Sequence, residues 1–189
     1  MQSEFIETLW PKIESSYKPD AGPVHQLLHE YVDKYKPGSY LEIGSRDGCS
    51  ASVVAESHPI TQIHCCDFPD NGWGGFGDSE KYLRLNLEKF AKDRHKILIG
   101  NSQTINTRLE IMAWGKHDLV YVDGDHSYDG GGTDFITACA CLNPGGIILI
   151  DDITHHPILG KLLESILLAG IHKDYQIHPE GTGCAALFF

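Results

Sequence analysis

Short apolar, β-branched runs alternate along this sequence with segments whose apolar residues recur at helical spacing, and this alternation constrains the fold most. The runs typical of strands occupy 40–44, 61–66, 96–100, 118–122, 146–151, 172–178 and 184–189. The helical segments between them fall at roughly 48–57, 79–93, 103–113, 130–142 and 157–169. Strict alternation predicts a parallel sheet with helices on both faces, and right-handed crossovers make it a doubly wound α/β fold.

The two ends of the chain depart from this alternation. Only residues 179–183 separate the last two strand runs, which is too short for a helix, so these strands should pair as an antiparallel hairpin. Two helices, at 3–17 and 23–35, are expected before the first strand. The sequence therefore predicts a seven-stranded, mostly parallel sheet with a C-terminal antiparallel hairpin, in which 1–37 are N-terminal helices of the same unit as 38–189.

Composition limits the class of protein and its partners. The chain has 189 residues, enough for one domain with a core of its own, and no apolar run approaches the roughly 20 residues that span a bilayer. A formal net charge of −11 argues against nucleic-acid or anionic-membrane partners. The six cysteines lack paired Cys-x-x-Cys spacing and are expected to be free thiols. The N-terminus has no secretory pattern, so we expect a cytoplasmic protein.

The loop after the first strand is glycine-rich. Gly44 permits a tight turn and Gly48 lets the backbone approach a ligand, while Asp67 after the second strand is placed to accept hydrogen bonds from ribose hydroxyls. Arg46 stands where a pyrophosphate-binding turn has its middle glycine. The pattern therefore favours a nucleotide-like cofactor other than a dinucleotide. A plain strand-to-helix turn and an NAD site are the alternatives.

The loop after the third strand carries Ser102 and Gln103, which suit the edge of a purine. The alternative is that Asn101 or Ser102 only caps the helix that follows. Elsewhere, the glycine-rich loop 70–78 is a candidate lid over the cofactor or the substrate. His155 and His156 either line a substrate pocket or face solvent.

Carboxylates follow the fourth and fifth strands. If these strands are neighbours, Asp123 meets Asp151 and Asp152, and three gathered carboxylates repel one another unless a cation holds them. Hard oxygen ligands favour Mg²⁺, or Mn²⁺ as an alternative. His126, three residues past Asp123, is the candidate base or substrate contact. The alternative for Asp125 and Asp152 is helix capping.

Together these motifs resemble the class I S-adenosylmethionine-dependent methyltransferases, and among them the small divalent-metal O-methyltransferases of the catechol, caffeoyl-CoA and macrolide-sugar types. The resemblance covers roughly 38–189 and rests on 41–45 with Ser50, on 100–103, on 122–126, and on 144–146 running into 151–152. It implies a Rossmann-like methyltransferase fold over 38–189. The catechol type has Asn at the third ligand and Lys at the base position, so Asp152 and His126 bring this chain closer to the sugar-modifying type.

The resemblance also implies roles for individual residues. The cofactor-binding positions are Glu42, Gly44, Ser45, Gly48 and Ser50 for the methionine end, Asp67 for ribose, Ser102 and Gln103 for adenine, and Asp123 beside them. The metal ligands are Asp123, Asp151 and Asp152, and the catalytic base is His126. The expected reaction is Mg²⁺-assisted O-methyl transfer to a small sugar, polyol or phenol, by a possible homodimer. The alternatives are an NAD-dependent oxidoreductase and a non-methylating metal-binding relative.

Overall fold

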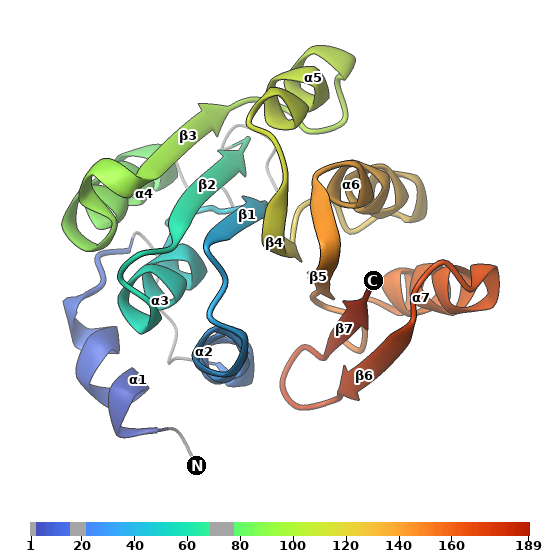
Figure 1. Ribbon diagram of the computed structural model, residues 1–189, viewed down its shortest axis with the longest axis horizontal. Helices are drawn as coiled ribbons and strands as arrows, with labels where there is room; N and C mark the ends of the chain where they lie inside the picture. The colour runs from blue at the N-terminus through green and yellow to red at the C-terminus, as the bar shows by residue number, and fades with distance from the viewer. Residues whose placement is uncertain (1–2, 16–21, 69–77) are drawn as a thin grey trace.

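One seven-stranded sheet lies at the centre of the fold in the computed structural model (Figure 1). The structure describes residues 3–15, 22–68 and 78–189. The strands are β1 (Ser39–Ile43), β2 (Gln62–Asp67), β3 (His95–Ile99), β4 (His117–Val122), β5 (Leu142–Ile150), β6 (Asp174–His178) and β7 (Cys184–Phe188). The α-helices are α1 (Glu4–Leu9), α2 (Pro23–Tyr35), α3 (Cys49–Ser57), α4 (Ser79–Phe90), α5 (Ile105–Ala113), α6 (Tyr128–Ala140) and α7 (Pro157–Ala169).

The strand order confirms the predicted fold. The strands lie in the order β3-β2-β1-β4-β5-β7-β6. The pairs β1–β2, β1–β4, β2–β3 and β4–β5 are parallel, whereas β7 is antiparallel to both β5 and β6. The order reverses at β1, which lies between β2 and β4, and ligands of open α/β sheets bind beyond the carboxyl ends of the strands at such a point.

Two apolar cores lie on the two faces of the sheet, because alternate strand residues point to opposite sides. Tyr40 and Tyr121 belong to the face covered by α1, α2, α3 and α4. Their neighbours Leu41 and Val120 belong to the face covered by α6 and α7 (Figure 1). In the described segments no helix is long and apolar enough to cross a bilayer.

The N-terminal helix is shorter than predicted. The helix expected over 3–17 ends as α1 at Leu9, followed by a short 3-10 helix over Trp10–Lys12. Pro11 has no N–H to donate and its ring crowds the preceding turn, so an α-helix cannot continue through it. Beyond it, Asn86 of α4 accepts a hydrogen bond from the Glu14 amide at 2.9 Å and donates one to the Glu14 carbonyl at 2.7 Å. The prediction is therefore wrong over residues 13–15, where a tertiary contact engages the backbone groups of Glu14; residues 16–17 lie outside the described residues.

Candidate active site

The turn after β1 is held against two neighbouring strands. The amides of Gly44 and Ser45 donate to the Cys66 carbonyl, at 2.9 and 3.3 Å. Gly44 has a φ of +93°, and a Cβ placed on it would lie 2.0 Å from the Asp123 carbonyl oxygen. Only glycine fits at this position. The turn thus lies directly against the end of β4, where the predicted cation site begins.

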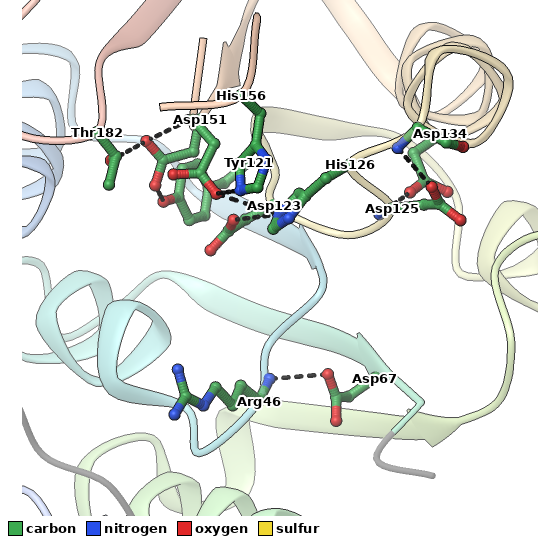
Figure 2. Close-up of polar contacts among 12 residues, drawn as sticks. Arg46, Asp67, Tyr121, Asp123, Asp125, His126, Asp134, Asp151, His156 and Thr182 are labelled. Carbon is green, nitrogen blue, oxygen red and sulfur yellow. Dashed lines mark hydrogen bonds and ion pairs between the residues drawn. The ribbon is translucent and has the colours of Figure 1, made fainter. Parts of the chain in front are cut away.

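Asp67 closes this turn from the end of β2. Its Oδ1 accepts a hydrogen bond from the Arg46 amide at 2.8 Å. Figure 2 shows that the Arg46 side chain points away from Asp67, so the contact is made by the backbone. Burial raises the pKa of Asp67, and the bonds from the Arg46 and Phe68 amides oppose that rise. The structure therefore brings the predicted ribose acceptor and the glycine-rich turn together.

The remaining residues of the first loop form the start of α3. Gly48 has a φ of +75°, and a Cβ there would lie 2.8 Å from Leu83 Cδ1 of α4. Ser45 is buried and Ser50 is half-buried. Asp47 is held from two sides: its carbonyl accepts from Asn86 at 2.8 Å and its carboxylate from the Ser15 hydroxyl at 2.5 Å. Sequence reasoning missed Asn86, because no local pattern shows that α4 supports this loop.

The loop after β3 is tied to the loop after β4 by a buried acid. Gln103 Nε2 donates to Asp134 Oδ1 at 3.0 Å and to Ser102 Oγ at 3.2 Å. The other Asp134 oxygen accepts from the Asp125 amide at 3.1 Å (Figure 2). Burial raises the pKa of Asp134 to about 6. Asp134 was not predicted, although an acid in the middle of α6, past the first-turn Asp129 and among small and apolar residues, is a detectable signal.

The helix-capping alternatives are resolved by the structure, and Asp152 is not a cap, because the N-cap position of α7 is His156. The N-cap of α5 is Thr104, whose hydroxyl accepts from the Thr107 amide. Ser102 and Asn101 therefore do not cap that helix, and Asn101 Oδ1 accepts from the Gln103 amide at 2.8 Å instead. Asp125 Oδ1 accepts from the amide of Ser127, which is itself the N-cap of α6. Asp125 thus shapes the loop. The candidate lid lies outside the described residues, apart from Asp78.

Three acids lie on the same face of the sheet as the buried residues Tyr40, Tyr121 and Leu149. Each acid follows one of these residues by two positions, and alternate residues of a strand point to the same side. In that order, the acids are Glu42, Asp123 and Asp151. Glu42 is 1% exposed and accepts from the Tyr40 hydroxyl at 2.9 Å. Burial, with Asp123 and Asp67 nearby, raises the pKa of Glu42 well above its usual value. Burial likewise raises the pKa of Asp123 to about 7; Asp151 and Asp152 add to this rise and His126 opposes it. The predicted gathering of carboxylates is therefore present, at a clear electrostatic cost.

The two acids after β5 are placed differently. Asp151 accepts hydrogen bonds from the Tyr121 hydroxyl at 2.5 Å, the Thr182 hydroxyl at 3.0 Å and the Asp152 amide at 2.8 Å. Its two oxygens are thus engaged by neutral donors. Asp152 instead has a φ of +61° and directs its carboxylate toward His126. Ligation by Asp123, Asp151 and Asp152 stays a prediction.

Two histidines complete this edge of the sheet. His126 Nε2 lies 3.1 Å from Asp152 Oδ2 and 3.7 Å from Asp123 Oδ1. His156 Nε2 lies 3.7 Å from the same Asp152 oxygen. Figure 2 shows both imidazoles beside the carboxylates at the ends of β4 and β5. The interaction with Asp123 raises the pKa of His126 against the effect of burial. His156, one of the two histidines left open by the sequence, therefore joins the site.

A cavity of about 420 Å³ opens beside this cluster, between α2 and the β6–β7 hairpin. Its polar lining includes Gln26, Glu30, Asp151, His178 and Glu180. Asp151 belongs both to this cavity and to the group of acids at the strand ends. A small polar molecule bound in the cavity would thus lie next to the end of β5.

Residues 41–153, more than half of the chain, match the family described as "Methyltransferase domain", and the chain belongs to this family. A curated relative, an uncharacterized protein of Acanthamoeba polyphaga mimivirus, is 26% identical over 77% of this chain and 70% of its own length. The fold is similar to that of an SAH-bound Podospora anserina methyltransferase, with a TM-score of 0.73 and 19% identity over 98% of this chain and 87% of that chain.

A second solved structure with this fold is the O-methyltransferase from Bacillus cereus in complex with SAH. It has a TM-score of 0.69 and 15% identity, and the match covers 100% of this chain and 92% of that chain. At such identities these structures establish the fold alone. Together with the family match, the fold confirms the class I methyltransferase that the sequence motifs predict.

Proposed function

We propose that this protein transfers the methyl group of S-adenosylmethionine to a hydroxyl oxygen of a small sugar, polyol or phenol. The observation that carries this proposal is the contact between the two halves of the site. Gly44 of the cofactor turn lies against the Asp123 carbonyl, and the Asp123 carboxylate belongs to the acid and imidazole cluster. A cofactor on that turn and an acceptor at the cluster would be immediate neighbours, as direct methyl transfer requires.

On the cofactor side, each predicted contact has a matching group. Asp67 would accept from the ribose hydroxyls, and Ser102 and Gln103 would meet the adenine. Glu42, Ser45 and Ser50 would surround the methionine end. The positive charge of a sulfonium would in turn favour the ionised form of the buried acids Glu42, Asp67 and Asp123, whose pKa burial raises, because opposite charges attract strongly in a poorly solvated site. That charge is lost when the methyl group leaves.

On the acceptor side, the cavity beside Asp151 has both apolar lining, such as Val24 and Leu27, and polar groups, such as Gln26 and Glu30, and so suits a small molecule that carries hydroxyl groups on a carbon ring. The acceptor oxygen would attack the methyl carbon as the sulfur–carbon bond breaks, and His126 is the predicted acceptor of the hydroxyl proton. A divalent cation such as Mg²⁺ or Mn²⁺ would lower the pKa of that hydroxyl. Asp123 and Asp152 offer oxygen atoms to such an ion, so the acids fit a cation.

Cofactor choice is the first test. Calorimetric titration with S-adenosylhomocysteine and, separately, with NAD⁺ should give binding of the former only. Asp67→Asn should weaken S-adenosylhomocysteine binding about tenfold, since hydrogen bonds to charged groups contribute roughly 1.5–3 kcal/mol. Asp93→Asn, at an exposed acid of the 3-10 helix over Lys92–Arg94, is the matched control and should leave affinity unchanged. Binding of NAD⁺ alone would refute the proposal.

Transfer itself is tested with labelled S-adenosylmethionine and a panel of sugars, polyols, phenols and catechols, with and without EDTA. We expect label on the oxygen of at least one class and loss of transfer after chelation. His126→Ala should lower turnover while cofactor affinity stays nearly intact. Transfer to nitrogen or carbon acceptors only would contradict the proposed chemistry, and transfer indifferent to EDTA would contradict the role of the cation.

A further inference from the structure

We propose that His126, His156 and Asp152 form a binding site for a divalent first-row transition-metal ion, such as Zn²⁺, Co²⁺ or Fe²⁺, in preference to Mg²⁺. The site lies within the proposed active site, so its catalytic meaning rests on the proposed function, whereas the binding of the ion does not. One ligand atom from each of the three residues lies within 4.8 Å of the other two.

The spacing of the ligand atoms suits a single ion. Bonds of about 2.0–2.2 Å place neighbouring ligand atoms roughly 3.0–3.6 Å apart. His126 Nε2 and Asp152 Oδ2 are 3.1 Å apart, and Asp152 Oδ2 and His156 Nε2 are 3.7 Å apart. Asp123 Oδ1 lies 3.7 Å from His126 Nε2 and is near enough to be a fourth ligand. Shifts of a few tenths of an ångström would complete the coordination.

The turn that presents these ligands is fixed before any ion binds. The Asp152 carbonyl accepts from the His156 amide at 2.9 Å. The amides of Thr154 and His155 both donate to the Thr182 carbonyl at 3.0 Å, which fastens the turn to the hairpin. The rings of His126 and His156 pack with their centroids 4.3 Å apart. Non-glycine residues at positive φ are uncommon and cluster at functional sites, and Asp152 adopts a φ of +61° here.

His126 Nε2 is buried without a hydrogen-bond partner among the described residues. Asp152 Oδ2 is close, at 3.1 Å, but is not aligned for a hydrogen bond. A buried polar nitrogen left unpaired costs free energy. An ion between Nε2 and the Asp152 oxygen would satisfy both groups and would also offset the repulsion between Asp152 and Asp123.

The chemistry of the ligands selects the ion. Mg²⁺ prefers oxygen ligands, whereas neutral imidazole nitrogen favours Zn²⁺, Co²⁺, Ni²⁺ and Fe²⁺. Two imidazoles and one carboxylate leave positions open for substrate oxygens. Asp151 is left out of this set because its oxygens already accept three hydrogen bonds. An ion on Nε2 would occupy the atom through which His126 would accept a proton, so metal ligation and the base role of His126 are alternatives; His126→Ala should lower turnover in either case.

The test is direct metal binding to the full chain, stripped with a chelator and measured without cofactor or acceptor. Titration with Co²⁺, followed by its visible absorption bands, should give one site, and Zn²⁺ should displace Co²⁺. Mg²⁺ should bind at least 100-fold more weakly than Co²⁺. His156→Ala should weaken Co²⁺ binding by tenfold or more, since even second-shell changes cost about 10–100-fold. His155→Ala, at the adjacent histidine, is the matched control and should change it less than twofold.

Three results would overturn the proposal: Mg²⁺ affinity equal to that of Co²⁺, Co²⁺ bands unchanged in His156→Ala, or equal losses in His156→Ala and His155→Ala. Circular dichroism checks that each variant folds. If His156→Ala does not, a wild-type preference for Co²⁺ over Mg²⁺ of less than 100-fold would overturn the proposal, because oxygen ligands alone distinguish these two ions far less than imidazole does. Selective Co²⁺ binding without methyl transfer to any acceptor would refute the proposed function but leave the metal site standing.

Discussion

Replacing Gly44 by alanine should destabilise the protein far more than the same change at Gly115. Both glycines have nearly the same positive φ, +93° and +96°. An added Cβ would lie 2.0 Å from the Asp123 carbonyl oxygen at Gly44, whereas at Gly115 it would have no atom of the described residues within 4 Å apart from its own chain neighbours. The pair therefore separates the cost of positive φ, common to both, from the cost of the steric clash.

The magnitude follows from the bonds that the clash would break. Positive φ costs an alanine about 1–2 kcal/mol, which is the whole effect expected for Gly115→Ala. Relieving the contact at Gly44 needs a shift of more than about 1 Å, incompatible with close packing. Such a shift breaks the bonds from the Gly44 amide to Cys66 and from the Asp123 amide to Ile43, both 2.9 Å. At about 1–3 kcal/mol for each unmade buried bond, Gly44→Ala should cost roughly 3–8 kcal/mol.

Urea unfolding followed by circular dichroism gives the free energy of unfolding of both variants, and thermal unfolding gives their Tm. At about 2–4 °C per kcal/mol, Gly115→Ala should lower Tm by roughly 2–8 °C and Gly44→Ala by clearly more. S-adenosylhomocysteine affinity should fall only for Gly44→Ala. Gly115 precedes the amino end of β4, whereas the candidate site lies at the carboxyl ends of the strands. Equal losses of unfolding free energy in the two variants would show that the contact with Asp123 does not fix this turn.

Two further predictions concern buried polar groups. Asp134→Ala should weaken S-adenosylhomocysteine binding about tenfold, by freeing Gln103 and the Asp125 amide; calorimetry against the exposed control Asp129→Ala tests this, and equal affinities would contradict it. Burial, with His117 and Lys96 nearby, lowers the pKa of His64 from 6.5 to about 4. The neutral imidazole of His64 hydrogen-bonds that of His117. Because the folded-state pKa is lowered, the free energy of unfolding is highest above pH 6.5 and falls as pH drops toward 4. Near pH 5 the loss should be about 2 kcal/mol. Urea unfolding at pH 5 and above pH 6.5 measures this loss. An equally large loss in His64→Phe would show that His64 is not its source.

The sequence by itself determined the sheet, the hairpin and the positions that carry chemistry. Strand–helix alternation and a five-residue gap at 179–183 are local patterns, and the parallel order that they predict is the one observed. Gly44, Asp67 and Asp123 were recognisable because ligand sites of such sheets lie at the carboxyl ends of strands. The helix predicted over 3–17 ends early in the structure. Pro11 cannot continue an α-helix, and the backbone of Glu14 is hydrogen-bonded to Asn86 of α4, which the local helical spacing does not reveal.

Only the tertiary structure decided which side chains act together. Asp134 and Gln103 are 31 residues apart, and Asn86 and Asp47 are 39 apart, so no local pattern links them. Asp151 and Asp152 are identical neighbours in the sequence. Tyr121 and Thr182 engage the first, while a φ of +61° turns the second toward His126. Side-chain direction depends on backbone dihedrals and on partners from distant strands, and both are fixed only when the chain has folded.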